Sequence, residues 1–197
     1  MVPMNSLSLR SLLAAPAIFS LAAGTAACAE TGSGSQGAGS RTLVAYVTRS
    51  GNTRVIADTL QRVLAADLFE IRPAQPYPLD YEEHVERARR ERDQGYEPPL
   101  AERGPDIAGY DTIFLGFPIW GETTPPPIRS YLKAYDFRGK IIRPFITHGS
   151  YGVGNSLSIL TSHAPGVPIE PPFVMEADQE RRTLNEIKGW LAEIKAS

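Results

Sequence analysis

From Thr42 onward, short apolar runs alternate with longer stretches of helical periodicity. This alternation is typical of βαβ units around a parallel sheet, in which each crossover helix covers one face. The predicted strands are Leu43–Val47, Asp67–Arg72, Thr112–Pro118, Ile141–Thr147 and Ile169–Met175. The last is expected at the edge of the sheet, because Pro171 and Pro172 have no N–H to donate to a ladder.

The segments between these runs differ in how much apolar surface they offer. Two carry an apolar stripe at helical spacing and are expected to pack on the sheet. The stripes are Val55, Ile56, Leu60, Val63 and Leu64 in the first, and Leu184, Ile187, Trp190, Leu191 and Ile194 in the second. Tyr81–Gln94 is so rich in Arg and Glu that a solvated helix is predicted. A helix over Ile128–Tyr135 is predicted to begin just after Pro125–Pro127, since proline favours the first helical position.

The N-terminal 29 residues have the layout of a secretory signal, with Arg10 ahead of the apolar run Leu12–Ala23 and small residues after it. That run is shorter than the ~20 residues that a membrane-spanning helix needs. Residues 30–41 contain too few apolar side chains to fold and are expected to be a flexible linker. The sequence therefore predicts an exported chain, periplasmic or otherwise extracytoplasmic, with one domain at residues 42–197.

Cys28 is the only cysteine and stands where this signal would end. The stretch Leu21–Cys28 resembles a bacterial lipobox, although Thr25 occupies a position where Leu, Val or Ile is usual. Membrane attachment through lipidated Cys28 and simple cleavage after Ala27 or Ala29 both remain open. With no second cysteine, no intramolecular disulfide can form. The formal net charge of −2 gives no reason to expect nucleic-acid binding.

One loop opens directly into a helix after the first predicted strand. Its sequence is Thr48-Arg49-Ser50-Gly51-Asn52-Thr53. Backbone N–H groups at a helix start, together with hydroxyls, attract an anion. The loop has no Gly-Lys-Ser/Thr, so a single terminal phosphate suits it better than a triphosphate. The alternative is that Asn52 or Thr53 merely caps the helix.

The T-x-S-G-N-T string closely resembles the FMN phosphate loop of flavodoxins, and the resemblance extends over most of residues 42–197. It implies a flavodoxin-like doubly wound α/β fold, with a five-stranded parallel sheet of order 2-1-3-4-5 and helices on both faces. It also implies FMN as the cofactor. By this resemblance Thr48, Ser50, Asn52 and Thr53 hold the phosphate, and Arg49 adds positive charge.

A second loop, Pro118-Ile119-Trp120-Gly121, follows the third predicted strand. The indole of Trp120 offers a flat surface on which a flavin ring can stack, although a core tryptophan is the alternative. The P-I-W-G string resembles the isoalloxazine loop of flavodoxin relatives. The resemblance implies a peptide flip at Gly121, because glycine tolerates the required dihedrals.

A third loop, glycine-rich, follows the fourth predicted strand. Its backbone can approach a ligand closely and donate to the pyrimidine edge of a flavin. The expected ring contacts are Thr147, His148, Gly149, Ser150 and Gly152, with Tyr151 as part of the opposite wall. His148 is expected to have a structural or hydrogen-bonding role in preference to acid–base catalysis. His84 and His163 lack metal-ligand spacing and are expected at the surface.

These loops favour an electron carrier whose FMN exchanges electrons with a protein redox partner. The near-neutral charge departs from the acidic surfaces usual in carriers. The alternative is an FMN-dependent NAD(P)H oxidoreductase that reduces a small-molecule acceptor such as a quinone, bound under Tyr77–Tyr96. A cofactor-free binding module is a third possibility. A phosphoacceptor domain is disfavoured, because Thr48 and Gly116–Pro118 stand where acidic residues would be needed.

Overall fold

The computed structural model describes residues 41–149, 151–176 and 180–196, and within these ranges the chain forms a five-stranded parallel sheet. The strands are β1 (Thr42–Tyr46), β2 (Asp67–Glu70), β3 (Thr112–Pro118), β4 (Ile141–His148) and β5 (Phe173–Glu176). Their order is β2-β1-β3-β4-β5, which confirms the predicted fold class. The expected signal segment and Cys28 lie outside the described residues.

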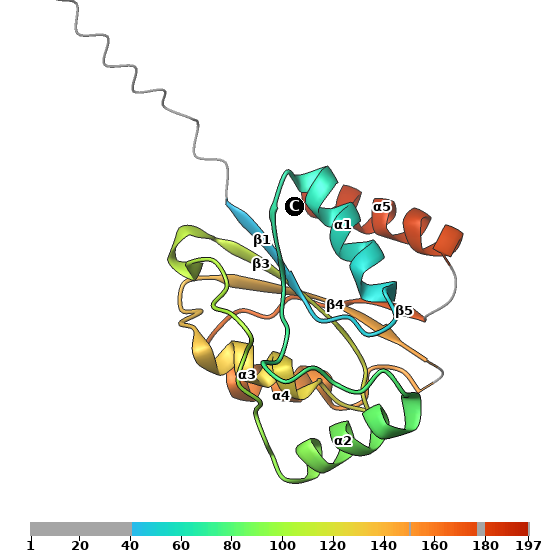
Figure 1. Cartoon of the computed structure of the whole chain (residues 1–197). Coiled ribbons are helices and arrows are strands. Elements are labelled where there is room, and N and C mark those ends of the chain that lie inside the picture. Colours follow the sequence, from blue (N-terminus) through green and yellow to red (C-terminus); the bar gives the residue numbers. More distant parts are fainter. Residues whose placement is uncertain (1–40, 150, 177–179, 197) are drawn as a thin grey trace, which may run out of the picture. The chain divides into compact units, whose positions relative to one another are not determined.

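Helices cover both faces of the sheet (Figure 1). On one face lie α1 (Asn52–Leu64) and α5 (Glu180–Ala196), and on the other lie α3 (Pro126–Ala134) and α4 (Ser156–His163). The three inner strands β1, β3 and β4 therefore bury side chains on both faces, which explains their continuous apolar runs in the sequence. Within the described ranges, no helix combines the length and the hydropathy that a bilayer span requires.

The edge strand starts later than the sequence suggested. Pro144 lies within β4, and the ladder from β4 to β5 begins only at Phe145. Ile169 forms an isolated bridge to Ile142, and Pro171 and Pro172 separate this bridge from β5. The prediction that the fifth strand begins at Ile169 was therefore wrong, because three prolines remove the N–H groups that would continue the ladder.

Two helices differ in detail from their predictions. Helix α3 begins at Pro126, with Pro125 as its N-cap, two residues before the predicted start at Ile128. The first-turn N–H groups of a helix have no intrahelical acceptor, so prolines there remove no bond. In α1, Val63 is 44% exposed, and Ala57 lies on the buried face in its place.

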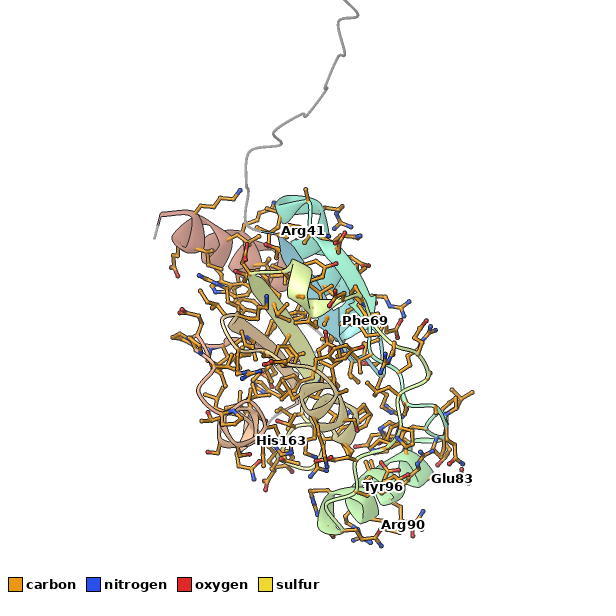
Figure 2. All side chains as sticks on the ribbon, turned by 90° about the vertical axis from the view of Figure 1, so that its left-hand side faces the viewer. Arg41, Phe69, Glu83, Arg90, Tyr96 and His163 are labelled. Atoms are coloured by element: carbon orange, nitrogen blue, oxygen red, sulfur yellow. The ribbon has the colours of Figure 1, made fainter. Side chains whose placement is uncertain are left out.

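Helix α2 (Tyr81–Asp93) lies beyond the carboxyl ends of the strands (Figure 1). In Figure 2, Glu83 and Arg90 lie far from Arg41, which precedes β1. The helix starts at Asp80, whose carboxylate accepts the N–H of Glu83 over 3.0 Å. Acidic side chains in its first turn and basic ones in its last also match the helix dipole. Local signals therefore suffice to form α2, although it has few apolar side chains.

Candidate functional site

The loops after β1 and β3 line one cavity of about 650 Å³, here called the shared cavity. Its loop residues are Arg49, Ser50, Asn52, Pro118, Ile119, Trp120, Gly121 and Gly149. All come from the carboxyl ends of strands, where open α/β sheets bind their ligands. Asn52 and Trp120, which the sequence assigns to two parts of one ligand, therefore share one cavity.

The loop after β1 leaves the start of α1 open to an anion. Gly51 is the N-cap with φ of +95°, and its N–H donates to Thr48 Oγ1 over 3.1 Å. Neither Asn52 nor Thr53 caps the helix, and no acidic side chain occupies its first turn. The first-turn N–H groups and the helix dipole therefore favour a phosphate at this point.

Thr53 and Thr147 lie beneath the loops and not on the cavity wall. Both side chains are buried, and their hydroxyl oxygens are 2.9 Å apart in a hydrogen bond. This bond ties the start of α1 to the end of β4.

A tight turn follows Trp120. Gly121 and Glu122 both have positive φ, +58° and +64°, and the Trp120 N–H donates to the Thr123 carbonyl over 3.1 Å. Glycine adopts this conformation freely, whereas a residue with a Cβ does so at a cost of about 1–2 kcal/mol. The backbone strain at Glu122 therefore lies beside the cavity, where such strain is often functional.

The loop after β4 packs directly on this turn. The Asn155 N–H donates to the Glu122 carbonyl over 3.1 Å. A Cβ placed at Gly154 would lie 1.8 Å from the same oxygen, so this position requires glycine. The second and third loops therefore form one backbone unit.

The predicted ring contacts of the third loop are only partly brought to the cavity. Gly149 lines it, whereas Tyr151 is 83% exposed. The ring of His148 bonds through Nδ1 to the adjacent Gly149 carbonyl. Gly152 has a left-handed backbone with φ of +69°, and Ser150 lies outside the described residues.

Helix α2 supplies the remaining wall of the shared cavity. Its lining residues are Tyr81, His84, Val85, Ala88, Arg89 and Arg92. Arg92 Nη1 donates to the Gly121 carbonyl over 3.1 Å, and the Arg49 guanidinium lies 4.9 Å from the centre of the Tyr81 ring. Most residues of α2 are exposed, as expected of a solvated helix, but its buried face, which was not expected, closes the site.

Trp120 packs against two further rings. The ring centres of Tyr77 and His84 lie 4.8 and 4.4 Å from that of Trp120, both in edge-to-face geometry. His84 is only 4% exposed, so its predicted surface position was wrong. Its Nε2 is buried without a hydrogen-bond partner among the described residues. Desolvation, followed by the positive charge of Arg49, lowers the pKa of His84 to about 4, so the ring is neutral at pH 7.

A buried ion pair fastens the segment before α2 to the helix. Glu91 accepts hydrogen bonds from Arg87 Nε, over 2.8 Å, and from the Tyr77 hydroxyl. Arg87 also donates to the carbonyls of Gln75 and Pro76 over 3.1 and 2.8 Å. Burial, followed by the bond to Glu91, raises the pKa of Tyr77, so its hydroxyl stays a donor.

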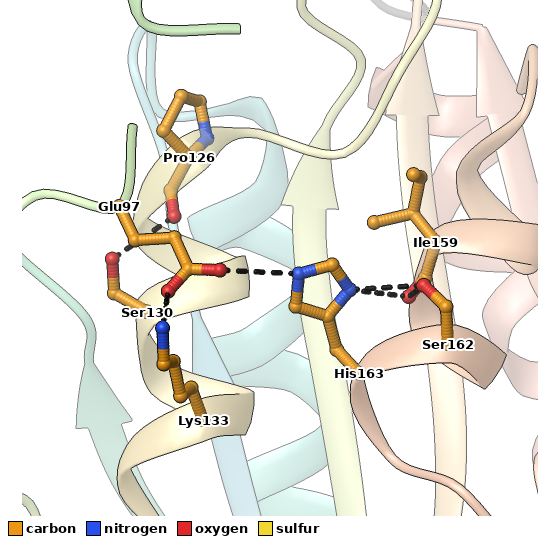
Figure 3. A network of polar contacts seen from close by, with 7 residues as sticks. All are labelled: Glu97, Pro126, Ser130, Lys133, Ile159, Ser162 and His163. Carbon is orange, nitrogen blue, oxygen red and sulfur yellow. Dashed lines mark hydrogen bonds and ion pairs between the residues drawn. The ribbon is translucent and has the colours of Figure 1, made fainter. Parts of the chain in front are cut away.

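Glu97 fastens the segment after α2 to the body of the domain. Its carboxylate lies 2.8 Å from Lys133 Nζ on α3 and 3.3 Å from His163 Nε2 on α4 (Figure 3). The bond to Lys133 is the main reason why the pKa of Glu97 lies below its ordinary value. His163, expected at the surface, is half-buried in this junction. Both ends of α2 are therefore attached through charged groups.

A second cavity of about 520 Å³, here called the proline-lined cavity, is also lined by Trp120 and His84. Pro73, Pro76 and Pro78 contribute to its wall. The two rings thus form a boundary that both cavities share. Within the described ranges, no group of three or more His, Cys, Asp or Glu side chains could hold a metal ion.

Comparison with known proteins gives both a family and a set of similar folds. A flavodoxin family model matches residues 41–194. A candidate flavoprotein from Bacteroides uniformis is 30% identical, with 78% of this chain and 99% of that chain covered and a TM-score of 0.68. For a candidate flavoprotein from Bacteroides eggerthii these values are 30%, 80%, 99% and 0.67. A flavoprotein from Lactobacillus acidophilus, solved in complex with FMN, is 21% identical, with 75% and 99% covered and a TM-score of 0.60. No curated protein sequence matches the chain.

Proposed function

The chain belongs to the flavodoxin family, and on this premise we propose that it binds FMN in the shared cavity and transfers electrons through it. One observation carries the proposal: the uncapped start of α1 and the indole of Trp120 line the same cavity. Its volume of about 650 Å³ lies in the usual range for small-molecule sites. The L. acidophilus flavoprotein of similar fold, which binds FMN, supports the choice of ligand.

The donor groups of the cavity match the parts of FMN. The first turn of α1, the Ser50 hydroxyl and the Arg49 guanidinium suit the phosphate. Trp120 suits the ring by stacking. The unpartnered Nε2 of His84 is a buried polar atom in the wall, and a polar atom of the ligand would satisfy it.

Bound FMN supplies one- and two-electron transfer. The chain's own residues orient and shield it: Trp120 and α2 exclude water from one side, and the Gly121–Glu122 turn presents backbone groups at the cavity wall. His84 stays neutral at pH 7, so it adds no charge next to Trp120. The Arg49 guanidinium balances the charge of the phosphate.

A fluorescence titration of the purified protein with FMN tests the proposal. Trp120→Ala is expected to weaken FMN binding about 10- to 100-fold, in line with the loss of one stacking partner. Trp190→Phe is the matched control, because Trp190 packs on Phe114 and Phe173 in the α5 face of the core. Wild-type protein that binds no FMN, or Trp120→Ala protein that binds it as tightly as wild type, would contradict the assignment.

A second candidate function is an FMN-dependent NAD(P)H oxidoreductase. The observation that favours it is the proline-lined cavity, which lies at Tyr77 and Pro78 and shares Trp120 with the shared cavity. A small acceptor there would be separated from the cofactor only by the rings of Trp120 and His84. Stopped-flow mixing of FMN-loaded protein with NADH and NADPH separates the two functions: rapid loss of flavin absorbance supports the reductase, and none supports a carrier that serves a protein partner.

Export is a separate proposal that rests on the N-terminal sequence alone. Residues 1–29 would direct the chain to an extracytoplasmic compartment, with the domain released or attached to the membrane through Cys28. Mass spectrometry of membrane and soluble fractions distinguishes lipidated Cys28 from simple cleavage after Ala27 or Ala29. If all of the protein were found in the cytoplasm with residues 1–29 still attached, export would be refuted.

A further inference from the structure

A third cavity, of about 750 Å³, adjoins the Gly121–Glu122 turn and is here called the arginine cavity. Arg92 and Gly121 line both this cavity and the shared cavity. Its other walls come from α3, through Arg129, and from the loop and first turns around α4, through Tyr151, Asn155 and Ile159. Arg129, Asn155 and Ile159 have no part in the proposed FMN site, and Tyr151, which the sequence assigned to a flavin wall, lines this cavity and not the shared cavity.

Arg129 is a buried cation with no ion pair to an acidic side chain among the described residues. The residue is 8% exposed, and its Nε and Nη2 make no hydrogen bond within the described ranges. Glu97 and Glu91 act on it electrostatically, but Lys133 and Arg87 respectively already neutralise them. A guanidinium remains protonated when buried, and a buried charge without a hydrogen-bonded counter-ion is unfavourable. An anion in the cavity that Arg129 lines would lower that penalty.

The charges and surfaces of the cavity limit which anion fits. Arg129 and Arg92 contribute two positive charges, and Glu122 contributes one negative charge. Arg92 also pairs with Asp93 at 2.7 Å, so the wall suits a monoanion better than a dianionic phosphate. Tyr151 and Ile159 provide a ring and an aliphatic side chain for an apolar body.

We propose that the arginine cavity binds a small planar monocarboxylate, whose carboxylate pairs with Arg129 and whose body packs on Tyr151 and Ile159. A carboxylate supplies the counter-ion that the guanidinium lacks, and a flat body suits the Tyr151 ring. The start of α4, with Asn155 as its N-cap, adds a favourable dipole at the same cavity. The ligand would lie beside the loop proposed to hold the flavin ring, but its binding does not depend on FMN.

Isothermal titration of the purified full chain with benzoate and with neutral benzamide tests this site. Wild type is expected to bind benzoate about tenfold or more tighter than benzamide, and Arg129→Met is expected to lose that preference. Arg138→Met is the control, because Arg138 is exposed, pairs with Asp136 and lies outside the cavity. No benzoate binding by wild type, equal affinity for benzamide, or benzoate affinity in Arg129→Met within about twofold of wild type would overturn the proposal.

A second measurement covers the case in which Arg129→Met does not fold. Benzoate added to isotope-labelled wild-type protein is expected to shift the amide resonances of Gly154 and Asn155 and the Nε resonance of Arg129. Gly154, Asn155 and Arg129 all line the arginine cavity, so shifts at these residues would place the ligand there. Saturable shifts confined to other surfaces, with these three unchanged, would refute the site.

Discussion

The sheet and helix α2 both form walls of the shared cavity, but different interactions hold them in place. Leu43, Ile113 and Phe117 of the sheet are fully buried and are stabilised by apolar packing. The buried residues of α2 are His84, Ala88 and Glu91, and its attachments are ion pairs, hydrogen bonds and an arginine–ring contact. Charged contacts respond to pH and salt far more than apolar packing does. The α2 wall is therefore the part of the site that solution conditions can loosen.

The largest expected effect breaks the sheet side of this comparison. A Cβ at Gly116 of β3 would lie 2.0 Å from the Phe145 ring, which is fully buried and cannot move aside. Gly116→Ala is expected to lower the free energy of unfolding by roughly 4 kcal/mol, at the upper end for overpacking. Urea unfolding measures it. Gly189→Ala, at an open helical position, is the control and should raise stability by about 0.5–1 kcal/mol.

The next effect breaks the α2 side. Glu91→Ala leaves the half-buried Arg87 and Tyr77 without their common partner and is expected to cost roughly 3 kcal/mol. Hydrogen exchange should show faster exchange of α2 amides with little change in β1 and β3. Glu86→Ala, which removes only an exposed pair with Arg90, should cost less than about 0.5 kcal/mol. Equal protection loss in the sheet and in α2 would show that the helix is not a separately attached wall.

A pH series sharpens the comparison. The pKa of His84 is about 4 in the folded protein and about 6.5 when unfolded, so the unfolded state binds more protons between these values. The contribution of neutral His84 is complete above pH 6.5 and declines as the pH falls toward 4. We expect wild type to lose about 2 kcal/mol of stability between pH 6.5 and 4.5 relative to His84→Phe, which has no proton to bind. Parallel stability curves for the two proteins would exclude His84 as the source.

The smallest effect concerns the turn where the two walls meet. Glu122→Gly relieves the left-handed strain at φ of +64° and is expected to raise the free energy of unfolding by about 1 kcal/mol. Glu122→Ala keeps the Cβ and should show no such gain. Thermal unfolding of both variants separates strain from the loss of the carboxylate. A lower melting temperature for Glu122→Gly would mean that the conformation is not strained.

The loops that line the shared cavity could be predicted because their signals are local. The hydroxyl and glycine pattern from Thr48 to Thr53 and the Trp120–Gly121 pair each follow an apolar strand in the sequence. In a parallel sheet the carboxyl ends of neighbouring strands lie at one edge, so loops far apart in sequence meet there. The α2 wall of the shared cavity was not predicted, because its signal is not local. His84, Ala88 and Glu91 lie at helical spacing, but polar side chains are normally solvated, so this face was interpreted as exposed.

The sequence by itself determined the order of elements, the parallel sheet and the two loops that open onto the shared cavity, because apolar periodicity and turn residues act over a few neighbours. Only the tertiary structure decided that Tyr77, His84 and Trp120 pack together, that Glu91 is buried, and that Nε and Nη2 of Arg129 have no hydrogen-bond partner in the described part of the chain. Whether a polar side chain is buried depends on partners from distant segments, and the residue's own chemistry does not specify them.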